Sequence, residues 1–347
     1  MKYFNVYSRS DVMAYTKMRR FVTRVGECVH VAEDKNNIAQ SIENSTSPYV
    51  LFGIPEDIGI RANMGLGGAD TAWEPFLSAF LNIQSNDFFS GDEVLMLGHF
   101  DFKEMKMLIE QNAADVEEKS DAYRHAVVTI DDAVEQLARI ITNAGKIPIA
   151  IGGGHNNAYP LIKGTSKGLH KLGRIPLAQI NCINLDAHTD FRPVEGRHSG
   201  NGFRYAEEDG YLLKYFVLGL HENHTPQNVY LDIMNNPFID FISYEDIFIR
   251  EKRNFAQALA HAVDFVSDNY TGIELDLDCV ENVLSSAITP SGISVLHARQ
   301  YLSYTSDKCK VAYLHICEGA SQLEDGRRSE TTGKLIGYFV TDFIKGA

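Results

Sequence analysis

Eight short apolar segments constrain the fold of this chain more than any other feature of its sequence. The segments at 49–55 and 94–98 are apolar almost without interruption, which is typical of strands buried on both faces of a sheet. Apolar residues at helical spacing lie between several of the segments. Strands that alternate with helices predict right-handed βαβ units, and therefore an α/β fold with a parallel sheet. The other expected strands are 147–151, 179–186, 215–220, 238–243, 272–278 and 311–317, and the expected helices include 110–143, 256–266 and 295–304.

The chain of 347 residues is long enough for one large domain or two modest ones, and a single large sheet favours one. Its composition, 44% hydrophobic and 22% charged, is that of an ordinary soluble globular protein. No apolar run reaches the roughly 18 residues that a membrane span needs. Residues 1–7 are too polar for the apolar part of a secretion signal. We therefore expect a cytoplasmic protein with no membrane partner.

Charge and cysteine content exclude further classes of function. The net charge of −14 argues against nucleic-acid partners, because affinity for nucleic acids comes largely from Lys and Arg. The basic cluster Lys17, Arg19, Arg20 and Arg24 is the exception, and we interpret it as the solvated face of a helix. The five cysteines form no C-x-x-C pair, which indicates reduced thiols rather than disulfides or a structural zinc site.

Residues 1–46 are predicted to form an N-terminal extension that packs on a main domain of residues 47–347. Helix-like apolar spacing follows Ser10 and Asp11, which can cap a helix, and the extension ends in a polar stretch. The main domain begins with a strand and a glycine-rich loop from Gly53 to Ala69. So many glycines predict a loop that is shaped around a ligand, and a plain connector is the alternative.

The segment 183–192, Ile-Asn-Leu-Asp-Ala-His-Thr-Asp-Phe-Arg, carries the first candidate metal ligands. If it continues as a strand, Asp186, His188 and Asp190 project from one face, because successive side chains of a strand alternate. Two carboxylates and an imidazole that converge in this way are costly unless a cation neutralises them. We interpret them as ligands of a divalent metal, and the alternative is a solvated loop that is polar by chance.

Two further segments place candidate ligands at strand ends. Gly-Gly-Gly-His at 152–155 is neither a dinucleotide fingerprint nor a P-loop, because it lacks the G-x-G-x-x-G and G-K-[ST] spacings. Its glycines allow a tight turn that leaves His155 at the sheet edge, although a lone histidine is more often structural. Asp276 and Asp278 share one face of the expected strand 272–278, where charges are costly unless they are paired or bound to metal.

Four carboxylates and two imidazoles are too many ligands for one tetrahedral zinc ion. Oxygen-rich coordination favours Mn²⁺, with Fe²⁺, Co²⁺ or Ni²⁺ as substitutes. Carboxylates that bridge indicate two metal ions roughly 3.5–4 Å apart, a pair that activates water for hydrolysis. The carboxyl ends of parallel strands, where ligands bind in such sheets, are also where these residues cluster. The six candidate ligands are His155, Asp186, His188, Asp190, Asp276 and Asp278.

These motifs, in this order and approximate spacing, resemble the ureohydrolase (arginase) family over roughly residues 49–320. The resemblance implies a three-layer arginase-like fold, with a parallel sheet of about eight strands and helices on both faces. It also implies two Mn²⁺ per chain, and the family's frequent oligomers leave a homo-oligomer open. By this resemblance His155 and Asp190 bind one metal, His188 and Asp278 bind the other, and Asp186 and Asp276 bridge the two.

Within this family, three features resemble formimidoylglutamases. Gly154 stands where arginases and agmatinases usually have Asp, and Arg192 stands where arginases have Asn. The stretch Ser-Gly-Asn-Gly-Phe at 199–203 resembles a Ser-Gly-Thr-Pro-Phe stretch of formimidoylglutamases. The usual loop histidine is missing, which makes the adjacent His198 the candidate proton shuttle. The chain departs from the family where Asp278 is not followed by Asp-Pro and where Glu318 is not followed by Asn-Pro.

The resemblance implies hydrolysis of N-formimino-L-glutamate to L-glutamate and formamide, a step of histidine breakdown. Glu318 is expected to hold the cationic formimino group, and Arg192 to pair with a glutamate carboxylate. Ser199 and Asn201 are expected substrate contacts on the same loop, where Arg197 and Arg204 are weaker candidates. One alternative is a hydrolase that releases urea from a guanidino compound such as arginine, agmatine or guanidinobutyrate. The other is a metal-binding family member without catalytic activity.

Overall fold

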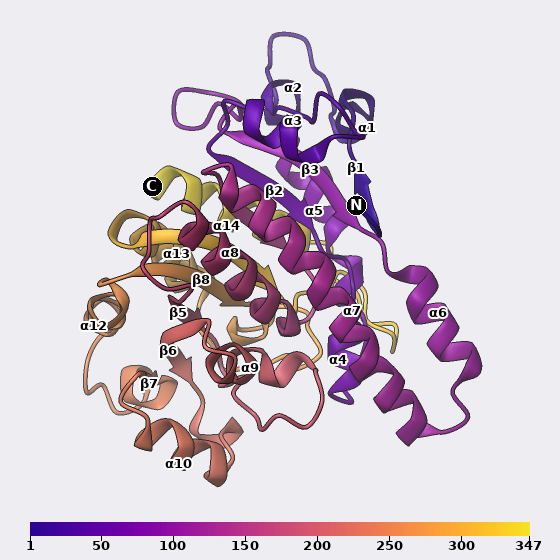
Figure 1. Cartoon of the computed structure of the whole chain (residues 1–347). Coiled ribbons are helices and arrows are strands. Elements are labelled where there is room, and N and C mark those ends of the chain that lie inside the picture. Colours follow the sequence, from indigo (N-terminus) through magenta and orange to yellow (C-terminus); the bar gives the residue numbers. More distant parts are fainter.

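A nine-stranded sheet runs through the middle of the computed structural model, which describes all 347 residues (Figure 1). The strand order is β1-β3-β2-β4-β9-β8-β5-β6-β7, and all neighbours are parallel except β1 and β3. The eight expected strands and the α/β fold are confirmed. The strands are β1 (Phe4–Val6), β2 (Tyr49–Gly53), β3 (Val94–Phe100), β4 (Ile147–Ile151), β5 (Ile180–Leu185), β6 (Leu212–Leu220), β7 (Ile239–Ser243), β8 (Tyr270–Asp276) and β9 (Lys310–Cys317).

Fourteen helices and five short 3-10 turns connect the strands. The helices are α1 (Arg9–Tyr15), α2 (Val25–Cys28), α3 (Ile38–Asn44), α4 (Ile58–Ala62), α5 (Trp73–Phe80), α6 (Lys103–Asn112), α7 (Val116–Asn143), α8 (Ala158–Lys171), α9 (Gly202–Glu208), α10 (Gln227–Asn235), α11 (Tyr244–Phe248), α12 (Phe255–Val266), α13 (Val295–Lys308) and α14 (Thr332–Gly346). The turns are η1 (Ala69–Thr71), η2 (His155–Asn157), η3 (Ser199–Asn201), η4 (Glu222–His224) and η5 (Leu277–Cys279).

Two hydrophobic cores of similar size, with 47 and 42 buried residues, cover the opposite faces of the sheet. Alternate residues of each strand enter different cores, as Leu51 and Phe52 of β2 do. Helices α5, α12, α13 and α14 pack on the first core, and α7, α8 and α9 pack on the second. The sheet is therefore the middle of three layers, which explains why its strands are apolar on both faces.

The N-terminal segment contributes to the sheet itself. Strand β1 lies antiparallel to β3, with Phe4 opposite Phe100. A strand of three residues shows no usable periodicity in the sequence, so only the structure reveals it. The division of the chain at residue 47 stays a prediction, and the segment before it packs against the main domain through both cores.

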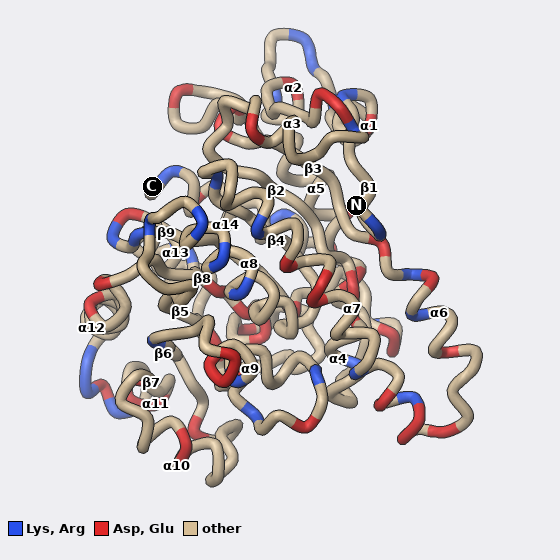
Figure 2. The backbone as a smooth tube through the Cα atoms, viewed as in Figure 1, with Lys and Arg blue, Asp and Glu red and all other residues tan.

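The basic cluster lies on a loop, because α1 ends at Tyr15 (Figure 2). The expectation of a helical face was therefore wrong, and Thr16 leaves the helix with extended backbone. Lys17, Arg19 and Arg20 are exposed there, while Arg24 is buried and donates to the carbonyl of Asn82. No helix combines the length and the apolar character that crossing a membrane requires.

Strands β4, β9, β8 and β5 are neighbours at the centre of the sheet. Because they are parallel, their carboxyl ends meet at one edge, which is where ligands bind in sheets of this kind. All the predicted metal ligands follow, or end, one of these strands.

Candidate metal centre

A tight glycine turn places His155 directly after β4. Gly152 and Gly153 have φ values of +91° and +78°, a backbone conformation that residues with a Cβ rarely adopt. A Cβ on Gly153 would also lie 2.8 Å from the carboxylate of Glu56. The chain then enters η2, where the His155 side chain is fully buried and points toward the ends of β8 and β5.

Glu56, which the sequence analysis did not single out, holds this turn in place. Its Oε1 accepts hydrogen bonds from the Gly154 amide at 2.9 Å and the Asn157 side-chain amide at 2.7 Å. Its Oε2 accepts from the amides of Ile58 and Gly59 at 2.7 and 3.1 Å. A pair of carboxylates, Glu56 and Asp57, directly after an apolar strand is the sequence signal that could have identified it.

Asp186, His188 and Asp190 lie in the turn that follows β5, which ends at Leu185. The expected strand alternation is therefore not what brings them together. The carboxylate of Asp186 accepts the backbone amide of His188 at 2.7 Å, which folds the chain back, and Asp190 has a positive φ of 45°. The same contact recurs after β8, where Asp276 accepts the amide of Asp278 at 2.8 Å.

The six predicted ligands converge in two groups that share Asp186. The first group is His155, Asp186, Asp190 and Asp276, and the second is Asp186, His188 and Asp278. The His155 Nδ1 atom lies 2.8 Å from Asp190, 3.1 Å from Asp276 and 3.3 Å from Asp186. The His188 Nδ1 atom lies 3.2 Å from Asp278 and 3.6 Å from Asp186. Asp186 thus contacts both histidines, whereas Asp276 belongs to the first group alone.

The donor set fits a pair of divalent cations. Both ring nitrogens of His155 and one oxygen of Asp278 are buried without a hydrogen-bond partner. Burial, reinforced by Asp278 and Asp186, raises the pKa of Asp276 well above its ordinary value. Burial and Asp186 likewise raise the pKa of Asp190. Carboxylates that destabilise one another in this way gain from a bound cation, and oxygen-rich donors favour Mn²⁺ over zinc.

A cavity of about 600 Å³ opens onto the two groups. Of the residues predicted to contact substrate, Arg192, Ser199 and Glu318 line it, and Asn201 and His198 do not. The other lining residues include Asn63, Glu195, His224, Asn228 and Ser286.

Arg192 lies at the rim of the cavity with its side chain partly exposed. Its guanidinium donates to Asn63 Oδ1 at 2.7 Å and to Glu195 Oε1 at 2.6 Å. Ser199 lies close by, with its hydroxyl 3.4 Å from the Asn63 side-chain amide. Arg192 and Ser199, two candidate substrate contacts on the loop after β5, thus share one neighbour, the Asn63 side chain of the glycine-rich loop.

His198 and Asn201 serve the loop rather than the cavity. The His198 Nδ1 atom accepts the Gly200 amide at 3.1 Å, and its Nε2 atom lies 3.2 Å from Glu195. Asn201 binds the backbone around it and the Arg197 side chain at 2.9 Å. The predicted roles in proton transfer and substrate binding stay predictions, and these contacts give them no support.

Arg197 and Arg204 are also committed elsewhere. Arg197 forms a buried ion pair with Asp131 of α7, at 2.8 and 3.1 Å. It also donates to the Asn156 carbonyl of η2 at 2.8 Å. Arg204 pairs with Glu208 on the surface of α9 at 2.7 Å. Arg192 is therefore the one arginine of this loop that faces the cavity.

Glu318 follows β9 and closes the base of the cavity. Its φ of +62° turns the chain out of the strand, and its Oε1 accepts the backbone amide of His155 at 2.8 Å. Burial, together with the charge of Asp278, raises the pKa of Glu318 to about 8. A cationic group beside it would therefore favour the charged form of this carboxyl group.

His224, on η4 after β6, is a cavity residue that sequence reasoning missed. Its ring stacks on the His188 ring with centroids 4.9 Å apart, and on the His221 ring on its other side at 5.1 Å. The spacing His-x-x-His at 221–224 after an expected strand was the available signal. Burial, together with the neighbouring His188, lowers the pKa of His224.

The arginase family matches this chain over residues 47–342, a range that contains all six candidate ligands and Glu318. This chain belongs to the arginase family. The predicted family is thereby confirmed, and the three-layer arrangement of this arginase-family protein is the one that the resemblance implied.

Formimidoylglutamases are among the relatives of this arginase-family protein. Those of Streptococcus pyogenes serotypes M6 and M49 are each 31% identical over 223 residues. The chain spans 60% of the length of these curated relatives, and the match covers 60% of the chain.

Several solved structures share the fold. Trypanosoma cruzi formiminoglutamase with Mn²⁺ has a TM-score of 0.66 at 20% identity, over 89% of this chain and 97% of that one. Formimidoylglutamase from Bacillus subtilis has a TM-score of 0.71 at 17% identity, over 95% and 94%. At these identities the likeness shows the fold alone.

Proposed function

We propose that this arginase-family protein is a metal-dependent hydrolase that cleaves N-formimino-L-glutamate to L-glutamate and formamide. The observation that carries the proposal is the cavity in which Arg192, Glu318 and both ligand groups face one another. A substrate that carries both a cationic amidine and carboxylates needs these two kinds of partner. The names of the S. pyogenes relatives support the same substrate.

The residues that would hold the cofactor are those of the two groups. His155 and Asp190 would bind one Mn²⁺, His188 and Asp278 the other, and Asp186 and Asp276 would bridge. The contacts of Asp186 with both histidines support its bridging role. When bound, such a metal pair acidifies water so that it can attack an amidine carbon at neutral pH.

Three residues of the chain itself would recognise the substrate. Glu318 would accept hydrogen bonds from the cationic formimino group, which would offset the cost of burying its carboxylate. Arg192 would donate to a glutamate carboxylate, and this requires its guanidinium to exchange the contact with Glu195 for the substrate. The Ser199 hydroxyl would donate beside it. His198 has no free ring nitrogen with which to protonate the departing amine.

Product release by the purified, Mn²⁺-loaded protein tests the proposal. Formamide from formiminoglutamate and urea from arginine and agmatine are assayed side by side. We expect formamide alone. Release of urea alone would support a hydrolase but contradict formiminoglutamate as its substrate. Glu318 can hold a guanidinium as well as an amidinium. If neither formamide nor urea forms from any of the three substrates, the result would favour a metal-binding protein without catalytic activity.

A further inference from the structure

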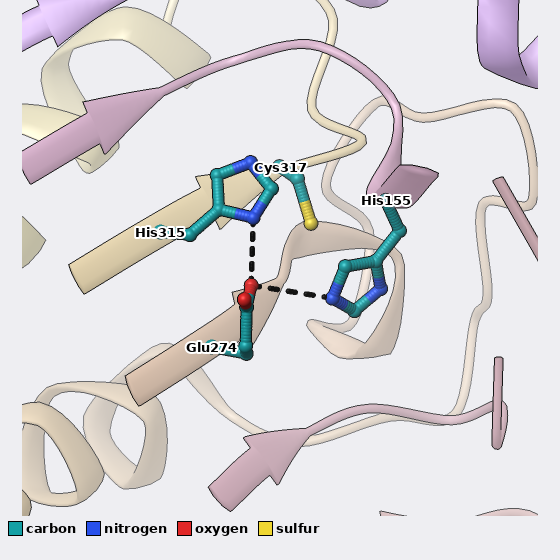
Figure 3. Close-up of side chains that lie close together, drawn as sticks. All are labelled: His155, Glu274, His315 and Cys317. Carbon is teal, nitrogen blue, oxygen red and sulfur yellow. Dashed lines mark hydrogen bonds and ion pairs between the residues drawn. The ribbon is translucent and has the colours of Figure 1, made fainter. Parts of the chain in front are cut away.

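Glu274 is a buried carboxylate behind the metal centre that the proposed function does not use. It lies on β8, two residues before Asp276, and its side chain has no exposed surface. Figure 3 shows it between the rings of His315 and His155. A carboxylate in a strand buried on both faces is expensive unless its oxygens are fully engaged.

Strand β9 supplies the groups that engage this carboxylate. Glu274 lies directly opposite His315 in the parallel register of β8 and β9. The His315 Nδ1 atom is 2.6 Å from Glu274 Oε2, and the Tyr313 hydroxyl donates to Oε1 at 2.6 Å. Both contacts are short, as hydrogen bonds to a charged carboxylate are.

The sequence makes room for this arrangement at Gly272. A Cβ at that position would lie 2.4 Å from the Tyr313 ring. Gly272 is opposite Tyr313 in the register, so the absence of a side chain lets the tyrosine lie flat across β8 and reach Glu274. The carboxylate is thus held on two sides by residues of the neighbouring strand.

The remaining side of the carboxylate faces the His155 ring. The His155 Nε2 atom lies 3.4 Å from Glu274 Oε2 (Figure 3) and has no hydrogen-bond partner. The other ring nitrogen, Nδ1, faces Asp190, Asp276 and Asp186. A histidine that binds a metal through one ring nitrogen commonly donates the proton on the other to a carboxylate. That donation fixes both the tautomer and the orientation of the ring.

We infer that Glu274, held by Tyr313 and His315, is a positioning residue that orients the His155 ring and keeps its Nδ1 lone pair directed at the metal centre. The inference rests on the proposed metal centre. Glu274 belongs to neither ligand group of that centre, and its oxygens accept hydrogen bonds from Tyr313 and His315. Cys317 completes the cluster, with its thiol directed to the Leu275 carbonyl at 3.7 Å.

Binding of Mn²⁺ alone, followed by calorimetry and by electron paramagnetic resonance, tests this role. The wild-type protein is expected to bind two ions and to give the spectrum of a coupled pair. In Glu274→Gln we expect the affinity of one site to fall about 10- to 100-fold, with the other site retained. At one equivalent of Mn²⁺ the variant would then show the spectrum of a single, uncoupled ion.

The double variant Glu274→Gln with His155→Ala distinguishes a positioning role of Glu274 from a general structural effect. His155→Ala should weaken the same site, and adding Glu274→Gln to it should cause little further loss, because Glu274 acts through His155. A purely structural contribution of Glu274 would instead add to the loss. Tyr313→Phe, which keeps the ring and removes one support of the carboxylate, should give a smaller decrease of the same kind.

The results distinguish failure of this inference from failure of the proposed function. Two Mn²⁺ sites of wild-type affinity in Glu274→Gln, or equal weakening of both sites, would overturn the positioning role alone. A wild-type protein that binds no Mn²⁺ would overturn the proposed function and the inference with it. Tyr313→Phe at wild-type affinity would contradict the support that we assign to its hydroxyl.

Discussion

At the scale of single residues, the cavity combines the cationic side chain of Arg192 with the buried carboxylate of Glu318. Arg192 is held by hydrogen bonds to Asn63 and Glu195, both of which line the same cavity. Its guanidinium is therefore already oriented before substrate arrives. On binding, only the contact with Glu195 would be exchanged for the substrate. Such preorganisation lowers the entropy that binding must otherwise overcome.

Substitution of Arg192 tests recognition of the carboxylate. In Arg192→Ala we expect the Michaelis constant for formiminoglutamate to rise about 10-fold or more, with a smaller change in kcat. The reason is that the variant loses a charge-assisted hydrogen bond to a carboxylate that is remote from the reacting carbon. Arg204→Ala, which removes an arginine from the adjacent surface of α9, is the matched control. An unchanged Michaelis constant in Arg192→Ala would show that the carboxylates bind elsewhere.

His198 makes the stability of the metal-free protein depend on pH. Burial, reinforced by Arg192, lowers the pKa of His198 from 6.5 to about 4 in the folded chain. Between pH 6.5 and about 4 the unfolded chain therefore binds a proton that the folded chain does not. The contribution of neutral His198 to the free energy of unfolding is complete above pH 6.5 and is lost as the pH falls toward 4. It amounts to about 3 kcal/mol at most.

Urea unfolding of the metal-free protein at pH 7 and pH 5 measures this contribution. The wild-type protein should lose more free energy of unfolding between these pH values than His198→Gln does. His125→Gln, on the exposed side of α7, should behave as the wild type. Equal losses in wild type and His198→Gln would show that the histidine is as readily protonated when folded as when unfolded.

At the scale of elements, the site depends on contacts between segments that are distant in sequence. The ion pair of Arg197 with Asp131 joins the loop after β5 to α7, and the Asn156 carbonyl joins both to η2. The Arg197 guanidinium lies over the rings of Tyr159 and Tyr205, 4.8 and 4.9 Å from their centroids. This junction fixes the loop that carries Arg192 and Ser199.

Removal of one partner of the Arg197–Asp131 ion pair should destabilise the protein more than removal of both. Arg197→Met leaves the Asp131 carboxylate buried and unpaired, and we expect a loss of about 3–5 kcal/mol in the free energy of unfolding. The double variant Asp131→Leu with Arg197→Met should lose less, because neither charge remains in the interior. Denaturant unfolding of the single and double variants measures both values, and a double variant that is less stable than Arg197→Met would contradict the argument.

The elements also show where sequence reasoning succeeds and where it stops. Strands such as β2 and β5 were predictable because burial on both faces leaves a continuous apolar run. The gathering of Asp186, His188 and Asp190 was foreseen, but its cause was not, since the side chain of Asp186 bends the chain after β5 ends. Contacts between segments, such as those of Glu56, leave no local pattern to detect.

At the scale of the whole molecule, the two ligand groups join residues at the ends of three central strands, β4, β5 and β8. Repulsion among four carboxylates at this edge works against folding, and bound cations reverse it. The sequence predicted this arrangement because each ligand follows an apolar strand, and parallel strands end at one edge. It could not predict which neighbours, among them Glu195, Asn63 and His224, complete the cavity, because their positions depend on how loops fold.

Metal removal should therefore destabilise the entire domain. We expect a chelator such as EDTA to lower the melting temperature, and added Mn²⁺ to restore and then raise it with increasing concentration, as a ligand that binds only the folded state does. Mg²⁺ at the same concentration is the control for general ionic strength. A melting temperature that is independent of Mn²⁺ would contradict a metal centre built across the central strands.

The three residues of β1 have a consequence for solubility. Without them, residues 98–100 of β3 would present unpaired amides and carbonyls at the margin of the sheet, a template on which a strand of another molecule can add. The family match begins only at residue 47, so a chain trimmed to that boundary would retain every candidate ligand but lose this cover. We expect such a chain to aggregate, as light scattering would show, while the full chain stays dispersed.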